Sequence, residues 1–593
     1  MTGRGGPDGG DVFARAQAHH QAGRLGEAEK LYRRVIDREP SHLGALYHLS
    51  LLAGQSGRAQ LAVAMGRRAA AAAPANPAVH NNLGVALMEL GRADESAAAF
   101  RTALALAPGT AAIHYNSGRA LKALGRPDEA AAAFRAAIRL RPDHANAHDA
   151  LGTLLAGLDR PEEAIGAFQA AVALEPGRAE FHCNLGNALA KTHRPGQAEA
   201  TLRRALELSP DLAEAHSSLA YALVGLGRLD EAAAECRRAA ALAPDSATFH
   251  DYLGNVFRQM LLTDDALAAY RRAVSLDPAF DDAHHDLAGL LLLRGDYAEG
   301  WEEHEWRFKS EVPHRPFPQP RWRGEDLAGR RLLVWGEQGI GDELAFFAIL
   351  PELVAGGADV VVECDPRLVP LLARSLPQVE AAVRTDPPDA RLLADDIDVQ
   401  APVVSAVALL RPSRSGFRPL PPYLTADAAV TADLRRDYGP GPLVGISWWT
   451  RHPKLERSFS IPLADWRPIL DVPGFRFVSL QYGAGRAEIA AAGFDLIDDI
   501  TVDPLTDLDR FAAQVAAMDL VISIDNSTVS MACVLGRPVW DLLAFVPDWR
   551  MGASGADSPW HPTLRLFRQP APGAWAPVVA EVAADLRRFV APT

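Results

Sequence analysis

A repeat of 34 residues constrains the fold of this chain more than any other feature of its sequence. Proline recurs at that interval through the first half, at positions 40, 74, 108, 142, 176, 210, 244 and 278. A series of small residues shares the period: Gly84, Gly118, Gly152, Gly186, Ala220, Gly254 and Ala288. Small residues let two helices approach closely, and a proline ends the second helix before the next repeat begins. The pattern therefore predicts pairs of helices stacked into a solenoid.

This period and spacing resemble the tetratricopeptide repeat. About eight full repeats and a partial ninth fit into residues 9–308. Repeats of this kind contact only their neighbours and build a superhelix with an extended concave face. The resemblance implies that this face holds a peptide or a protein. Three asparagines in register with the repeat are expected to face the concavity. There an amide can donate to and accept from a peptide backbone. The alternative is that these asparagines are solvated residues of the groove. They are Asn82, Asn116 and Asn184.

Histidine also follows the period, at positions 80, 114, 148, 182, 216, 250 and 284. With one histidine per repeat, neighbouring rings would lie roughly a repeat apart, too far to share a metal ion. We expect these histidines to pack in the core or in the groove.

The composition argues against several classes of protein. The 593 residues carry a formal net charge of −14 and a pI of about 5.7, which argues against a nucleic-acid partner. The four cysteines lie far apart, unlike a disulfide framework or a zinc site, and fit a reducing compartment. We see no apolar signal region and no apolar run long enough to span a bilayer. The sequence predicts a cytoplasmic protein of several domains without membrane insertion.

The second half of the chain alternates short strands with helices. After a proline-rich connector, 309–330, strands are expected at 331–336, 359–364, 397–403, 443–449, 475–481, 519–524 and 538–544. Helical patterns separate several of them, for example 342–355 and 506–518. This alternation is typical of doubly wound parallel sheets. We expect one lobe at 331–429, a break at 430–442, a second lobe at 443–593, and a ligand cleft between the lobes.

The stretch "RLLVWGEQGIGDE" is predicted to place an acid at the rim of the first lobe. A strand ends at Trp335, turns through glycines and starts a helix near Asp342. Gln338, Gly339 and Gly341 would form the loop on the acceptor side, and Asp342 could remove a proton from an acceptor. Capping of the helix by Asp342 is the alternative. The glycine order is not that of the dinucleotide-binding fingerprint.

Two segments of the second lobe carry candidate phosphate-binding groups. In "DLVISIDNSTVS", Asn526, Ser527 and Thr528 open a helix whose free N–H groups suit a phosphate, while Asp525 would order the loop or meet a sugar hydroxyl. In "GISWWTRHPKLERSFSIPL", Lys454 and Arg457 could supply the positive charge, with a solvated basic loop as the alternative. The pair Asp396 and Asp398 is a weak candidate for holding a metal-bound nucleotide.

Together the repeats and the motifs "WEEHEWRF", "EQGIGDE", "RSFSIPL", "VSLQYG", "DNSTVSMACVLGRPVW" and "PDWR…SPWHPTLRLFRQ" resemble bacterial repeat-containing glycosyltransferases. The catalytic half is similar to the lipopolysaccharide heptosyltransferases, and the whole plan is similar to O-GlcNAc transferase and to flagellin-glycosylating enzymes. The resemblance implies a GT-B fold of two Rossmann-like lobes, with no metal or other cofactor.

The same resemblance implies roles for single residues. Asp342 would be the catalytic base. The donor nucleotide sugar would be bound by Trp448, Lys454, Arg457, Gln481, Tyr482, Asp525, Asn526, Ser527, Thr528 and Ser530. At Ser530 the chain departs from relatives that often carry histidine, and a serine supplies no imidazolium charge.

These features predict an inverting, metal-independent protein O-glycosyltransferase. It would move a sugar from a nucleotide to a serine or threonine of a protein held by the repeats, flagellin being one such acceptor. The alternatives are a non-catalytic repeat scaffold with a degenerate transferase half, and a transferase acting on a glycan or a lipid. The sequence leaves the sugar and the oligomeric state open.

Overall fold

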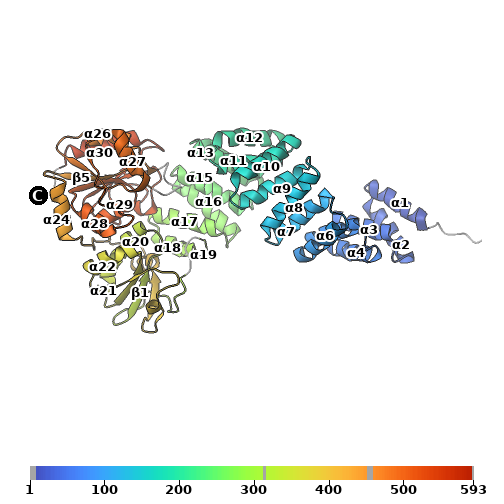
Figure 1. Cartoon of the computed structure of the whole chain (residues 1–593), viewed down its shortest axis with the longest axis horizontal. Helices are drawn as coiled ribbons and strands as arrows, with labels where there is room; N and C mark the ends of the chain where they lie inside the picture. The colour runs from blue at the N-terminus through green and yellow to red at the C-terminus, as the bar shows by residue number, and fades with distance from the viewer. Residues whose placement is uncertain (1–8, 311–314, 451–458, 590–593) are drawn as a thin grey trace, which may run out of the picture. The chain divides into compact units, whose positions relative to one another are not determined.

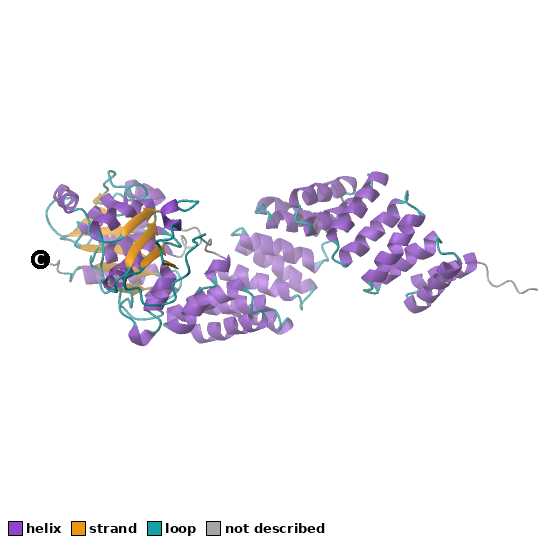
Figure 2. Ribbon diagram, turned by 90° about the horizontal axis from the view of Figure 1, so that it is seen from below, coloured by secondary structure: helices purple, strands orange, loops and turns teal. Residues whose placement is uncertain are grey.

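The computed structural model describes residues 9–310, 315–450 and 459–589. The chain divides into two compact units, Met1–Leu242 and Ala243–Thr593. The boundary between these units lies inside the repeat array, whereas the sequence places the end of the repeats at residue 308. Figure 2 shows the strands of the described chain gathered in its C-terminal part.

The repeats are pairs of helices of nearly constant length, and Figure 1 shows consecutive pairs packed side by side within each unit. The first unit holds α1 (Gly9–Gln21), α2 (Leu25–Arg38), α3 (Leu43–Gln55), α4 (Ala59–Ala72), α5 (Pro77–Glu89), α6 (Ala93–Leu106), α7 (Ala111–Ala123), α8 (Pro127–Leu140), α9 (Ala145–Gly157), α10 (Pro161–Leu174), α11 (Ala179–Lys191), α12 (Pro195–Leu208), α13 (Ala213–Gly225) and α14 (Leu229–Leu242). The second unit continues with α15 (Ala247–Gln259), α16 (Thr263–Leu276), α17 (Asp281–Arg294), α18 (Tyr297–His304) and α19 (Arg307–Ser310).

The periodic glycines lie where the two helices of a repeat cross. A Cβ at Gly118 would lie 2.7 Å from the Phe134 ring, and one at Gly254 would lie 2.6 Å from the Tyr270 ring. Such distances are closer than carbon atoms tolerate, so a large side chain on the second helix requires glycine on the first. Where the series holds Ala220 instead, the equivalent partner position holds the smaller Cys236. Size is thus matched across the helix pair at these three positions.

The periodic histidines make one conserved contact per repeat. In all seven cases the ring Nε2–H donates to the carbonyl oxygen of the proline six residues earlier, at 2.8 to 3.2 Å. A carbonyl only accepts, so Nε2 carries the proton. The histidine therefore ties its helix to the proline that ends the preceding helix, which is a more specific role than the packing expected from the sequence.

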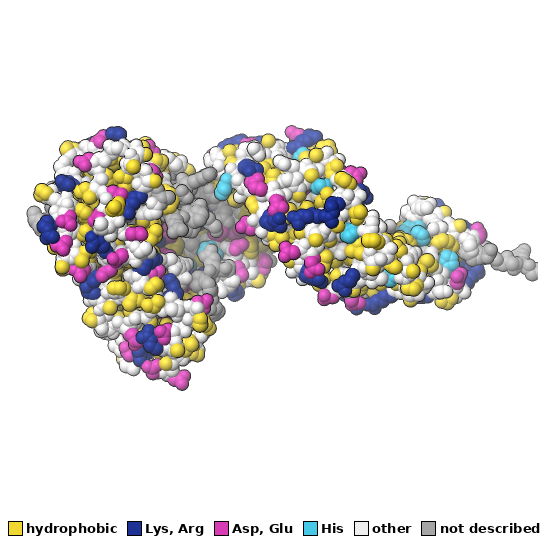
Figure 3. All heavy atoms as spheres, in the orientation of Figure 1, with side chains coloured by type: hydrophobic (Ala, Val, Ile, Leu, Met, Phe, Trp, Pro, Cys, Tyr) yellow, Lys and Arg dark blue, Asp and Glu magenta, His cyan; other side chains and the backbone are white. Residues whose placement is uncertain are grey.

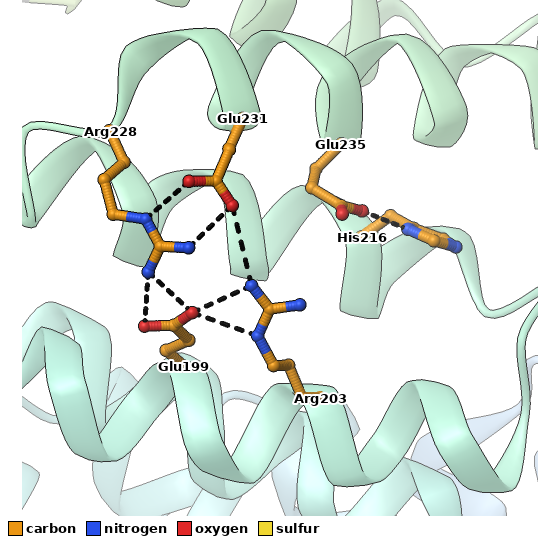
Figure 4. A network of polar contacts seen from close by, with 6 residues as sticks. All are labelled: Glu199, Arg203, His216, Arg228, Glu231 and Glu235. Carbon is orange, nitrogen blue, oxygen red and sulfur yellow. Dashed lines mark hydrogen bonds and ion pairs between the residues drawn. The ribbon is translucent and has the colours of Figure 1, made fainter.

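Charged side chains link neighbouring repeats on the solvent side. Glu199 accepts hydrogen bonds from Arg203 and from Arg228 of the next repeat, and Arg228 also pairs with Glu231 (Figure 4). On the face drawn in Figure 3, acidic and basic side chains are interspersed over the repeats. Exposed pairs of this kind contribute roughly 0–1 kcal/mol each, so they support the stacking without dominating it.

The first sheet has four parallel strands in the order β3-β2-β1-β4. Strands β1 and β2 are buried almost throughout, as parallel strands covered on both faces must be. The elements are β1 (Arg331–Trp335), α20 (Ile340–Phe346), α21 (Leu350–Ala355), β2 (Asp359–Cys364), α22 (Val369–Ser375), β3 (Glu380–Val383), β4 (Val399–Pro402) and α23 (Val403–Leu410), with 3₁₀ turns η1 (Phe347–Ile349), η2 (Pro366–Leu368), η3 (Ala390–Leu393) and η4 (Arg414–Gly416).

The second sheet has six parallel strands in the order β10-β9-β8-β5-β6-β7. Its central strands β5 and β8 are fully buried. The elements are α24 (Ala428–Asp437), β5 (Leu443–Ser447), η5 (Leu463–Trp466), α26 (Arg467–Leu470), β6 (Arg476–Ser479), η6 (Gly483–Arg486), α27 (Ala487–Ala492), β7 (Leu496–Ile497), α28 (Leu508–Ala516), β8 (Leu520–Ile524), α29 (Ser527–Val534), β9 (Val539–Leu543), η7 (Trp549–Met551), β10 (Leu564–Arg568) and α30 (Trp575–Leu586).

All seven predicted strands are present, and three further ones complete the sheets. No sequence pattern predicted β3, β7 or β10. The segment 430–442, predicted to be a break, is mostly helix, because α24 runs through it and packs on α28. Helices α20 and α29, which follow β1 and β8, lie side by side between the two sheets (Figure 1). The carboxyl ends of both sheets therefore meet at these two helix starts, which is where α/β proteins bind ligands.

Candidate functional site

Two neighbouring acids, Asp342 and Glu343, follow the glycine turn after β1, and their side chains point in different directions. Glu343 points inward with a fully buried side chain, pairs with Arg384 at 2.7 Å and accepts the Asp365 N–H at 2.8 Å. A Cβ at Gly336 would lie 2.2 Å from Glu343 Oε1, so glycine is required there. Burial raises the pKa of Glu343 to about 7. Glu343 therefore braces the turn.

Asp342 faces the second sheet instead. The N-cap residue of α20 is Gly339, and Asp342 lies in the first turn, where a hydrogen bond from the Gly339 backbone gives it a helix-capping contact as well. Its Oδ1 lies 3.1 Å from Nη1 of Arg550, and the carboxylate keeps 28% of its surface exposed. Of the predicted acceptor-side loop, Gln338 and Gly339 are exposed. Asp342 is thus partly open to solvent and held by a cation from the other sheet.

The start of α29 lies directly opposite the glycine turn. A Cβ at Gly341 would lie 3.6 Å from the Cα of Ser527 and 3.8 Å from Oγ of Ser530. Asn526 is the N-cap residue, and its Oδ1 accepts the Thr528 N–H at 2.9 Å. The structure thus brings Asp342, Ser527 and Ser530 together from segments far apart in the sequence.

The Thr528 hydroxyl and the Asn526 amide differ in their hydrogen bonding. Thr528 is fully buried, and its Oγ1 is without a hydrogen-bond partner in the described structure. The Asn526 Nδ2 donates to Ser447 Oγ at 2.9 Å, which ties the start of α29 to the end of β5. Asn526 therefore shapes the helix start rather than offering a free amide.

Three carboxyls lie near Arg550 on the side of the second sheet, and one of them, Asp541, is fully buried. Burial and the nearby Asp548 raise the pKa of Asp525, at the end of β8, to about 7. Asp541 of β9 is fully buried, neither of its carboxyl oxygens has a partner in the described structure, and burial raises its pKa well above the ordinary value. An unpaired buried charge is costly, and this cost is what favours the protonated form of Asp541.

Two of the predicted donor-binding residues, Gln481 and Trp448, have buried side chains. The Gln481 side chain is buried: its Oε1 accepts the N–H groups of Trp448 and Trp449 at 2.9 Å, and its Nε2 donates to the carbonyls of Trp449 and Tyr482. Trp448 is fully buried in the core of the second sheet. Both residues fix the turn after β5, and only Tyr482 of this group is half-exposed.

The remaining predicted residues divide into two groups. Lys454 and Arg457 lie outside the described residues, together with the rest of 451–458. Asp396 and Asp398 lie near the amino end of β1, whereas Asp342 follows its carboxyl end. There Asp396 pairs with the Arg331 guanidinium at 2.6 Å, and Asp398 accepts the Arg331 N–H at 2.7 Å. That pair of acids anchors the start of β1.

Sequence reasoning missed the network beneath the glycine turn. Arg307 of α19 is only 1% exposed and donates to Glu337 at 2.6 Å and to Ser405 at 2.8 Å. Glu337 also accepts the N–H of Val404 at the start of α23. The motif "WEEHEWRF" offered the only hint. Through this network, the helix that ends the repeats holds the turn that carries Asp342.

The asparagines of the repeats differ in accessibility. Asn82 is only 7% exposed, so the structure differs from the prediction that it faces the groove. Asn116 donates to Asn81 Oδ1 at 3.0 Å and Asn184 donates to Asp149 at 2.8 Å, in each case across to the preceding repeat. A small hollow is lined by Val85, Met88, Glu89 and Arg119.

Comparison with known proteins identifies the repeats. The tetratricopeptide repeat family matches residues 13–77, 49–111, 81–145, 115–179, 183–247 and 253–300. The N-terminal solenoid therefore consists of tetratricopeptide repeats. Protein FlbA of Caulobacter vibrioides is 37% identical over 329 residues, which cover 51% of this chain and 54% of that protein. The chain thus spans about half the length of this relative.

Two solved structures resemble parts of the chain. One is YrrB, described as a TPR protein with an unusual peptide-binding site: it is 24% identical with a TM-score of 0.27, covering 32% of this chain and 97% of its own. The other is the APC/C hetero-tetramer Cut9-Hcn1, 16% identical with a TM-score of 0.37, covering 47% of this chain and 55% of its own. Both likenesses are too slight to carry an inference. Among the described helices, none is long and apolar enough to cross a membrane.

Proposed function

We propose that the chain is a protein glycosyltransferase of the GT-B type. It transfers a sugar from a nucleotide donor to a serine or threonine of a protein bound by the repeats. Asp342 is the base, and a single displacement inverts the anomeric centre. The acceptor is a protein such as flagellin.

One observation carries this proposal: Asp342 at the carboxyl end of β1 lies beside the start of α29 at the carboxyl end of β8. The acid thus stands next to the start of a helix, with the Ser527 and Ser530 side chains close to Gly341. A helix start favours phosphate, and a half-exposed acid can accept a proton from a hydroxyl. Both groups that a sugar transfer requires are then within reach of one ligand.

The repeats support a protein acceptor. The Asn116 and Asn184 amides lie along the repeat helices, and the hollow at Met88 and Arg119 combines apolar and charged walls. Such surfaces suit a peptide in an extended conformation.

The proposal is tested by replacing the base. Asp342→Asn is expected to lower sugar transfer by roughly 10²- to 10⁴-fold, the usual contribution of a general base, with the donor affinity unchanged. The matched control is Asp465→Asn, an exposed acid of the second sheet unit, which should keep full activity. An Asp342→Asn enzyme within threefold of wild type would remove Asp342 from this role.

Donor binding is tested separately. Calorimetry with UDP, GDP, ADP and CMP is expected to give one nucleotide that binds in the micromolar range and binds more weakly to Ser527→Ala. Ser275→Ala, at an exposed serine of the repeats, is the control.

The second candidate is a scaffold that binds partners without catalysis. Ser530 favours it, because serine supplies no positive charge to a diphosphate. Binding of none of the four nucleotides, with intact folding, would favour the scaffold over the enzyme.

A further inference from the structure

The segment Pro547–Arg550 follows β9 and supplies the arginine that pairs with Asp342. Asp548 closes the turn: its Oδ1 accepts the backbone N–H of Arg550 at 2.9 Å and the side-chain Nε–H at 2.8 Å. Both ends of the arginine are therefore fixed by one carboxylate. The guanidinium is only 15% exposed, and its Nη1 extends to Asp342.

Aromatic rings on both sides hold the segment against α20. The Trp549 ring is stacked on Phe346 of α20 with centroids 5.9 Å apart, and it lies edge-on to Trp560 at 5.4 Å. The Arg550 guanidinium lies 5.7 Å from the centroid of Phe346. Because α20 also carries Asp342, this helix contacts both Trp549 and Arg550. The arginine cannot move away from Asp342 without disturbing this packing.

The charged groups that face Asp342 are Arg550 and Asp548 from the loop after β9, and Asp525 from the end of β8. Burial raises the pKa of Asp342, and Arg550 opposes that rise. Burial and Arg550 together lower the pKa of His561 to about 4, so this histidine is neutral at pH 7 and cannot replace the arginine. Arg568, the next cation, donates to the backbone carbonyls of Met551, Gly552, Ser554 and Gly555.

We propose that Arg550 is a positioning residue for Asp342. Its guanidinium, held by Asp548 and by the packing of Trp549, pairs with the Asp342 carboxylate and fixes it beside the start of α29. The pairing stands on the geometry alone, whereas its consequence for turnover rests on the proposed function.

The test is the titration of Asp342 in the full-length protein labelled with ¹³C at aspartate side-chain carboxyls. The Asp342 resonance is identified as the one missing from Asp342→Asn. In Arg550→Gln its midpoint is expected to rise by one pH unit or more, since an opposite charge this close shifts a carboxyl by about 1–3 units. Arg550→Lys, which keeps the charge but loses the planar fork, should shift it less than half as far. The control, Arg418→Gln, removes an arginine that is 72% exposed and should leave the midpoint unchanged.

The outcomes separate the two proposals. An unchanged Asp342 midpoint in both Arg550 variants, with melting curves like wild type, overturns the positioning role. If Arg550→Gln fails to fold, the shift in Arg550→Lys decides alone. Where turnover is measurable, the acid limb of its pH profile should move with the midpoint, and a uniform loss at every pH would mark a purely structural role and overturn the proposal. A wild-type protein without turnover counts against the transferase, while the titration still decides the role of Arg550.

Discussion

At the scale of single residues, the turn between the two helices of a repeat carries a left-handed backbone conformation. Glycine occupies this place in six repeats, at positions 23, 57, 91, 125, 227 and 295. Three repeats force a side chain into the same region: Asp159, His193 and Leu261, with φ of 55°, 58° and 54°. A residue with a Cβ pays roughly 1–2 kcal/mol for this conformation. These three positions are therefore strained.

His193→Gly is expected to stabilise the protein, because the exposed ring is lost at little cost and the backbone strain is relieved. The greater freedom of glycine in the unfolded chain offsets part of the gain, which leaves about 0.5–1 kcal/mol. Thermal unfolding followed by circular dichroism measures the change. His193→Ala removes the same ring but keeps a Cβ, so it should bring no gain. Equal midpoints for the two variants would contradict the account.

The residues of the candidate site were only partly predictable. Asp342, Ser527 and Ser530 could be found because each follows a recognisable strand, and parallel strands end at one edge. The partner Arg550 could not, since nothing local in "PDWR" says which acid its side chain will reach. Gln481 and Trp448 were misjudged for the same reason: a polar or aromatic residue at a strand end does not reveal whether its side chain turns inward.

At the scale of elements, the repeats depend on matching a small residue with a large one across the helix pair. The 34-residue period made all the repeat helices predictable, because eight copies of one signal reinforce each other. The strands β3, β7 and β10 gave no such signal. Strand β7 has two residues, and β10 (Leu564–Arg568) has arginine at two of its five positions, so neither has the pattern of a buried strand of a parallel sheet.

Gly118→Ala should destabilise the protein by about 1–3 kcal/mol, because the new methyl group would overlap the Phe134 ring. Combining it with Phe134→Cys copies the pair Ala220 and Cys236. The double variant is expected to lose less stability than the sum of the single changes. Gly109→Ala is the control, since no atom lies within 4 Å of the added Cβ. Additive losses in thermal unfolding would speak against size matching.

At the scale of the whole molecule, the second compact unit begins at Ala243, well before the repeats end. Residues of α18 and α19 are part of its core: Trp301 donates its indole N–H to the Arg411 carbonyl at 2.9 Å, and Arg307 pairs with the buried Glu337. The sequence suggested a boundary at residue 308, because repeat periodicity continues to that point. Periodicity reports how a segment folds and not what it packs against.

A fragment of residues 243–593 is therefore expected to melt cooperatively. A fragment of residues 309–593 should be far less stable, since breaking a buried ion pair alone costs about 3–5 kcal/mol. Differential scanning calorimetry compares the two. Arg307→Gln in the full chain isolates the contribution of the ion pair. Similar melting temperatures for both fragments would place the boundary at residue 308 after all.

The size matching of helix pairs bears on how such a chain can change length during evolution. Each glycine faces a large side chain of its own repeat, and each histidine bonds to the proline that introduces that repeat. A duplicated block of 34 residues would include both the glycine with its large partner and the histidine with its proline. The array upstream of Ala243 can therefore gain or lose whole repeats without a second compensating mutation. The helices α18 and α19 that end the array lack this freedom, because Trp301 is bonded to Arg411 and Arg307 to Glu337. Variation in repeat number among descendants of a common ancestor should therefore be confined to the N-terminal part.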